Sequence, residues 1–236
     1  KRLSADAYAR LGDINSLWKA YRNHTEAGED EKALGCLVAA GHIPLDKDPP
    51  WHRQNWDPLR HVTEGLDEQC KKDPARIRTA VAVLQKWVDS PSPYLRRIGL
   101  IGLGRIYRDV KQPAKGLELL LAAADLCRNQ KDNWFEHGEY QALATAALCH
   151  GDMGEPTRGI RLIEELGPRL RKAFYYWNSA LCFALGDLYV LNGEPKKAVA
   201  VYEQYDDWYP NAHPQVRTRL EQLRKDLGIE PPTRVA

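Results

Sequence analysis

Residues 181–210, LCFALGDLYVLNGEPKKAVAVYEQYDDWYP, decide the fold of this chain. They contain two stretches with the apolar periodicity of a helix, separated by a turn. One face of the first stretch carries Leu181, Leu185, Leu188 and Tyr189, and the apolar side of the second carries Ala198, Val199, Val201, Tyr202 and Tyr205. Gly193 suits the end of the first helix, Pro195 suits the first turn of the second, and Pro210 stops it. The stretch therefore predicts a helix, a tight turn and a second helix.

The small and aromatic residues of this stretch follow a known repeat pattern. The residues at the positions of the pattern are Leu185, Gly186, Tyr189, Gly193, Ala198, Tyr202 and Pro210. In these residues the stretch resembles the tetratricopeptide repeat (TPR). The resemblance implies two antiparallel helices that approach closely at the small Gly186 and Ala198, with aromatic side chains between successive pairs. Because one pair cannot bury its apolar face alone, the units must stack.

The same turn recurs along the chain. Pro113, Pro156 and Pro195 each open a helical stretch, at a spacing of about 40 residues, whereas the usual TPR period is about 34. Further units are marked by Leu103, Gly104, Tyr107, Gly116, Leu120 and Ala123, by Ala146, Ala147, His150, Gly154, Gly159 and Ile163, and near the N-terminus by Leu17, Ala20, Tyr21, Gly28, Ala33, Leu37 and Ala40. No alternating run bounded by hairpin turns is found. The predicted fold is all-α, an α-solenoid of antiparallel TPR-like helix pairs.

The predicted organisation is one continuous solenoid domain with an irregular middle. Two helices expected over 59–71 and 74–90 form a diverged pair, in which Ile77, Val81, Leu84 and Val88 share one stripe. The predicted segments are an N-terminal TPR-like unit (1–45), a loop (46–58), the diverged pair (59–93), three TPR-like units (94–212), a capping helix (213–228) and a tail (229–236).

Composition and charge exclude several classes of protein. The chain has 34 basic and 32 acidic residues and a net charge of +2, so it carries no broad positive field for nucleic acid. No apolar run is long enough to predict a membrane span. The five cysteines are odd in number, widely spaced and without a C-x-x-C pair, which favours a reducing, cytoplasmic location. Four of them lie in apolar helical settings and are predicted to be small buried hydrophobes: Cys36, Cys127, Cys149 and Cys182.

The sequence offers no constellation that predicts catalysis, a cofactor or a metal. The glycines of residues 99–104 stand in the wrong order for a dinucleotide loop, no strand precedes them, and helix packing explains them better. The histidines form no H-E-x-x-H motif. Adjacent carboxylates such as Glu164 and Glu165 diverge on a helix, which indicates a solvated face. The chain is therefore predicted not to be an enzyme.

A partner-binding surface follows from the resemblance, because in TPR arrays the first helix of each pair lines the concave face. The residues predicted to bind a partner are Trp18, Arg22, Ile101, Arg105, Arg108, Gln141, Phe183 and Asp187. The Lys and Asn clamp that one TPR subgroup uses for chaperone carboxylates is missing. Arg105 and Arg108 would either meet an acidic partner or pair with acidic neighbours within the fold. Trp51 and Trp56 would either bind a partner or pack on neighbouring helices.

The function predicted from these features is a non-catalytic scaffold that binds a partner protein or peptide. One alternative is the helical sensor region of a larger signalling ATPase of the STAND class, whose repeats the phrase AGEDEKAL (residues 27–34) resembles. Since residue 1 is Lys, the chain is expected to be a piece of a longer polypeptide. A third alternative is a helical enzyme. The sequence gives no indication of the oligomeric state.

Overall fold

The computed structural model describes residues 6, 9, 13–42, 58–130, 133–166, 169, 179–209 and 214–229. All regular secondary structure among these residues is helical, and they contain no strand. The fold is therefore an all-α solenoid, as the sequence predicts. No helix in the described part of the chain has both the length and the apolar character needed to cross a lipid bilayer.

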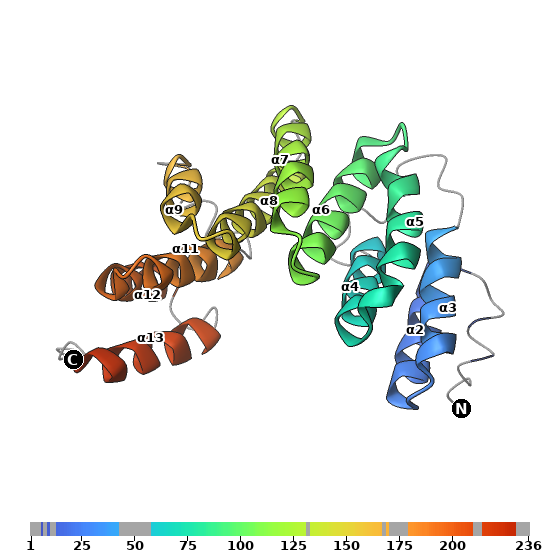
Figure 1. Ribbon diagram of the computed structural model, residues 1–236, viewed down its shortest axis with the longest axis horizontal. Coiled ribbons are helices and arrows are strands. Elements are labelled where there is room, and N and C mark those ends of the chain that lie inside the picture. The colour runs from blue at the N-terminus through green and yellow to red at the C-terminus, as the bar shows by residue number, and fades with distance from the viewer. Residues whose placement is uncertain are drawn as a thin grey trace. The chain divides into compact units, whose positions relative to one another are not determined.

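The chain divides into two compact units, Lys1–Phe135 and Glu136–Ala236. In the first unit the described residues form antiparallel helix pairs, and each pair packs beside the next (Figure 1). The pairs are α2 (Ile14–Glu26) with α3 (Asp30–Gly41), α4 (Pro58–Lys72) with α5 (Ile77–Val88), and α6 (Pro93–Asp109) with α7 (Pro113–Arg128). The pair expected over 59–93 is confirmed as two helices, with a short 3₁₀ turn, η2 (Pro74–Arg76), before α5.

The second unit contains the stretch that decided the fold. Its helices are α8 (Asn133–Asp152), which begins at the end of the first unit, α9 (Pro156–Glu164), α11 (Ser179–Leu191), α12 (Pro195–Trp208) and α13 (Pro214–Leu227). Helix α11 packs against α9 and α12, and α13 packs against α12. The expected helix at the C-terminal end of the chain is thus observed as α13. That the whole chain forms one continuous domain stays a prediction.

The turn inside each TPR-like pair has the same backbone conformation. Gly28, Gly154 and Gly193 have φ of +74°, +78° and +74°, and the equivalent Lys111 has φ of +63°. After each of these residues, an amide N–H bonds back to a carbonyl five residues earlier, as from Glu194 to Tyr189 at 2.8 Å. This bond satisfies a carbonyl at the helix end. The prediction that Gly154 and Gly193 end a helix before a proline is confirmed.

Glycines stand where two helices cross most closely. A Cβ atom built on Gly186 would collide with the ring and hydroxyl of Tyr202, and one on Gly104 would collide with Leu120. A Cβ on Gly159 would collide with the backbone carbonyl of Ala147. Ala198 is fully buried. The packing role predicted for Gly104, Gly186 and Ala198 is confirmed.

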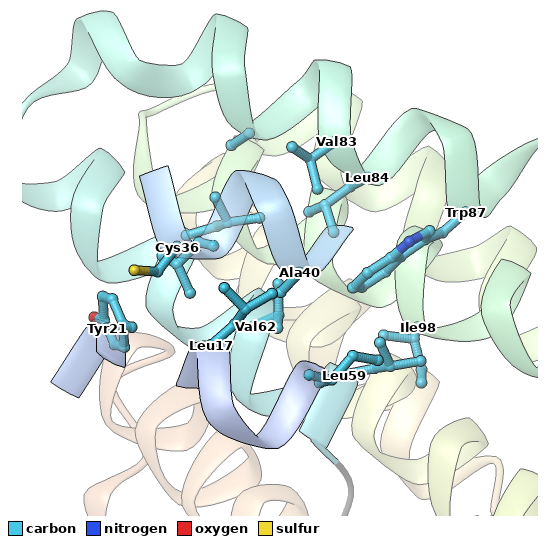
Figure 2. Packing of buried hydrophobic residues seen from close by; sticks show 14 of the residues in the cluster. Leu17, Tyr21, Cys36, Ala40, Leu59, Val62, Val83, Leu84, Trp87 and Ile98 are labelled. Atoms are coloured by element: carbon cyan, nitrogen blue, oxygen red, sulfur yellow. The ribbon is translucent and has the colours of Figure 1, made fainter. Parts of the chain in front are cut away.

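Helices α2 to α6 all contribute residues to the core of the first unit. Figure 2 shows Leu17, Ala40, Leu59, Trp87 and Ile98, from α2 to α6, meeting in one cluster. Trp87 is 3% exposed, and its Nε1–H donates to the carbonyl of Gly41 at 3.3 Å. The stripe predicted on α5 is displaced, because the fully buried positions are Ala80, Val83, Leu84 and Trp87, while Ile77, Val81 and Val88 lie at the margin.

The cysteines are all buried, including Cys70. The prediction that Cys36, Cys127, Cys149 and Cys182 act as small hydrophobes is therefore confirmed. Trp51, Trp56 and most of the loop predicted over 46–58 lie outside the described residues, as do Trp177 and residues 230–236.

We expect the substitution Gly159→Ala to destabilise the chain by about 1–3 kcal/mol, because the new methyl group must displace a backbone carbonyl that cannot rotate away. The matched control is Gly35→Ala, at an open position within α3 where nothing lies near the added Cβ. This control should stabilise by about 0.5–1 kcal/mol through helix propensity alone. Urea unfolding of both variants measures the difference, and destabilisation of equal size in both would contradict the packing argument.

Candidate functional site

Helix α11 turns one row of residues away from the core. Ala180 and Val190 are exposed, and Phe183 and Asp187, between them on the same face, are half-buried. The opposite side of the helix carries Leu181, Leu185 and Leu188, all buried. This division follows the helical period, so the outward row is the one predicted from the repeat pattern.

A depression lies between this row and α13. Its volume is about 680 Å³, and it is lined by Phe183 from α11 and by Gln215, Thr218, Arg219 and Gln222 from α13. We call these five residues the α11–α13 groove. The four residues from α13 recur every three or four positions, so they share one face of that helix.

One ion pair crosses the groove. Arg219 Nη1 donates to Asp187 Oδ1 at 2.6 Å, and the guanidinium carbon lies 5.9 Å from the centre of the Phe183 ring. Behind Phe183 lies the Tyr202 ring, at a centroid distance of 6.2 Å and an angle of 58°. Phe183 is therefore an aromatic floor held between a buried ring and a positive charge.

The other lining residues of the groove, Gln215, Thr218 and Gln222, are polar and uncharged. Gln215 is exposed, and within the described residues its side chain makes no hydrogen bond. Gln222 Nε2 donates to Asp226 Oδ1 at 2.8 Å, which fixes the orientation of that amide. Each carboxamide combines a donor and an acceptor, as a peptide unit does. The groove can therefore hold an apolar group over Phe183 and hydrogen-bond a neighbouring backbone.

The residues predicted on α2 are engaged within the first unit. The Trp18 ring stacks on Tyr21 at 4.9 Å and on His61 at 5.0 Å between centroids. Arg22 lies 3.7 Å from Glu26 on the surface of the same helix, a pair that is worth little where both groups are exposed. Trp18 thus joins α2 to α4 in this structure, whatever else it contacts.

The residues predicted on α6 are also engaged or covered. Ile101 is 7% exposed. Arg105 Nη2 lies 3.6 Å from Oδ2 of the buried Asp67, which also accepts from Lys71 at 2.8 Å. Of the two alternatives left open for Arg105, the structure has pairing within the fold. Arg108 is half-buried. Ile101 and Arg105 are therefore not part of the partner-binding surface that we propose.

The predicted residues are brought together only in part. Phe183 and Asp187 meet at one groove, whereas Trp18 and Arg22 share α2, and Gln141 is half-buried on α8. The four lining residues of α13 were not predicted from the sequence, because this helix was expected only as a cap. Their signal was present in the polar positions 215, 218, 219 and 222, which flank the stripe of Val216, Leu220, Leu223 and Leu227 on one side of the helix.

The candidates for catalysis and for metal or nucleotide binding find no support among the described residues. Burial raises the pKa of the Cys70 thiol to about 11 and raises the pKa of Cys182 further, so neither is a ready nucleophile. Among the described residues, no three His, Cys, Asp or Glu side chains are placed to hold a metal ion. Gly99 and Gly104, candidates for a phosphate loop by composition, lie inside α6 at helix crossings.

Comparison with known proteins agrees with the geometry. Residues 179–211 match the family model of the tetratricopeptide repeat. The TPR-like repeats of a putative kinesin light chain from Podosopora anserina share 18% identity with this chain, over 90% of it and 98% of that chain, with a TM-score of 0.54. A single-residue variant of the same protein is 18% identical over 90% of this chain and 97% of that chain, with a TM-score of 0.56. A search of curated proteins found no match.

At identities this low, the structural similarity shows the fold alone. Together with the matched repeat, it makes this chain a TPR-like helical repeat protein. Such repeats are generally scaffolds for protein interaction and are typically not enzymes. YrrB, another TPR protein, is 16% identical over 93% of this chain and 100% of YrrB, with a TM-score of 0.41.

The ionisation of Glu64, which lies near Trp18, should make the stability of the folded chain depend on pH. Burial raises its pKa from the ordinary 4.5, but the hydrogen bond with His61 and the charge of Arg60 lower it more, to about 2. A carboxyl whose pKa is lower in the folded state stabilises that state above pH 4.5, and the gain disappears as the pH falls towards 2. Between pH 5 and pH 3 the wild type should lose about 1–2 kcal/mol relative to Glu64→Gln. Urea unfolding at both values measures this loss, and a constant difference would exclude it.

Proposed function

We propose that this chain is a non-catalytic interaction module that binds a segment of a partner protein in the α11–α13 groove. The TPR-like fold supports a scaffold in general. The observation that carries the specific proposal is an aromatic floor, Phe183, flanked by the amides of Gln215 and Gln222 in a depression of about 680 Å³. That volume lies within the usual range for a pocket that holds an organic ligand.

The spacing of the amides favours an extended segment. Gln215 and Gln222 lie seven positions apart on α13, which is a distance of about 10 Å at 1.5 Å per residue. An extended chain covers this distance in about three residues. Two amides can then hydrogen-bond the backbone of the segment while one of its side chains lies over Phe183.

The charge around the groove favours an uncharged anchor side chain. Arg219 and Asp187 neutralise one another across it, and Phe183, Gln215, Thr218 and Gln222 carry no charge. A buried charge on the ligand would lose its hydration without a free counter-charge. We therefore propose an aliphatic or aromatic anchor residue.

Other predictions from the sequence stay open. Trp18, Arg22, Arg108 and Gln141 remain candidates for further partner contacts. The alternative of a sensor region in a STAND-type ATPase would be supported by a nucleotide-binding module in the same gene product. The absence of catalysis, the cytoplasmic location and the lack of nucleic-acid binding are likewise part of the proposal.

A displayed library of random heptapeptides, selected on the purified chain, provides the test. We expect enrichment of segments with one apolar anchor. For a synthetic selected peptide, Phe183→Ala should weaken binding at least tenfold, and Gln215→Ala or Gln222→Ala about two- to tenfold. Isothermal calorimetry measures these affinities, and thermal melts check that each variant folds.

The matched control is Glu221→Ala, on the same helix but outside the groove, which should leave the affinity unchanged. A library without enriched peptides, or equal affinity of the wild type and Phe183→Ala, would contradict the proposed site.

A further inference from the structure

Arginines tie helix α13 to the neighbouring helices of the second unit. Three of its arginines form ion pairs with acidic residues on α11 and α12. The pairs are Arg217 Nη2 with Asp206 Oδ1 at 2.8 Å, Arg219 Nη1 with Asp187 Oδ1 at 2.6 Å, and Arg224 Nη2 with Glu203 Oε1 at 2.8 Å.

Few apolar residues attach α13 to the neighbouring helices. Only Val216 and Leu220 are buried among its residues, at 1% and 3% exposure, while Leu223 and Leu227 are half-buried. An isolated helix of this length is marginal in water. Detachment of α13 would therefore also unfold it and expose its amides to exchange.

The groove depends on the attachment of this helix. Four of its five lining residues belong to α13, and only Phe183 comes from the body of the unit. Arg219 contributes both to the groove, which it lines, and to the attachment of α13, because it pairs with Asp187. If α13 leaves, the floor remains but the polar wall disappears.

We infer that α13 is a reversible, arginine-latched helix whose docking forms the binding groove. The side chains are 38% and 15% exposed in Arg217 and Asp206, 55% and 35% in Arg219 and Asp187, and 14% and 39% in Arg224 and Glu203, so each pair is partly open to solvent. Exposed ion pairs weaken as ionic strength rises. Salt therefore loosens α13, and a ligand in the groove holds it down, the latter step resting on the proposed function.

Hydrogen exchange of the α13 amides in the whole chain tests the latch. Between 0.05 and 0.5 M NaCl, exchange of α13 should rise several-fold relative to the amides of α11, which serve as the internal reference. At the lower salt, Arg224→Gln should raise α13 exchange about two- to fivefold, since one partly exposed pair contributes about this much.

The control variant is Lys225→Gln, which removes the same charge from the same helix at an exposed residue without an ion pair among the described residues. It should exchange like the wild type. Exchange of α13 that ignores salt, or that is the same in Arg224→Gln and Lys225→Gln, would overturn the latch.

A peptide selected on the chain separates the latch from the groove. At ten times its dissociation constant, a ligand that binds only the docked state should slow α13 exchange about tenfold. If α13 responds to salt and to Arg224→Gln but not to the bound peptide, the latch stands, and the proposed binding site is wrong.

Discussion

The close approach of two helices at a glycine is the contact on which the rest of this structure depends. At Gly186 the place of a side chain is taken by the Tyr202 ring, and at Gly159 by a backbone carbonyl of α8. No other residue leaves this space, and interiors packed to native density cannot absorb an added carbon without displacement. The position of each glycine thus sets how closely the second helix of a pair lies against the first.

This packing decides which residues remain for a partner. Tyr202 fills the space beside Gly186 and also lies behind Phe183, and the outward row of α11 stays exposed or half-buried. The groove then needs only one further helix, α13, to supply polar walls. In the site that we propose, the repeat supplies the apolar floor and the last helix supplies the amide wall, which is a role beyond covering the end of the core.

Local signals in the sequence predicted the helix pairs, their turns and the packing glycines, because each depends on residues within a few turns of one another. Gly193, Pro195 and Ala198 are examples. That Arg105 pairs with Asp67 in particular, and that Trp18 stacks on His61, could not be predicted, since these contacts join α4 to neighbouring helices. The stripe on α5 was displaced for the same reason, because periodicity defines a face but not the direction from which neighbours cover it. Of the residues that line the groove, Phe183 follows from the repeat pattern. The four residues of α13 do not, because their position depends on how α13 packs against its neighbours.

A double-mutant cycle between Gly186→Ala and Tyr202→Leu tests the central contact most directly. In the wild-type background, Gly186→Ala should destabilise by about 1–3 kcal/mol, because the methyl group meets the Tyr202 ring. With Leu at position 202 the ring is gone, and the same change should be neutral or stabilise by up to about 1 kcal/mol through helix propensity. Chemical unfolding of the four proteins measures the coupling. An equal cost of Gly186→Ala in both backgrounds would contradict the claim that this glycine exists to admit the facing side chain.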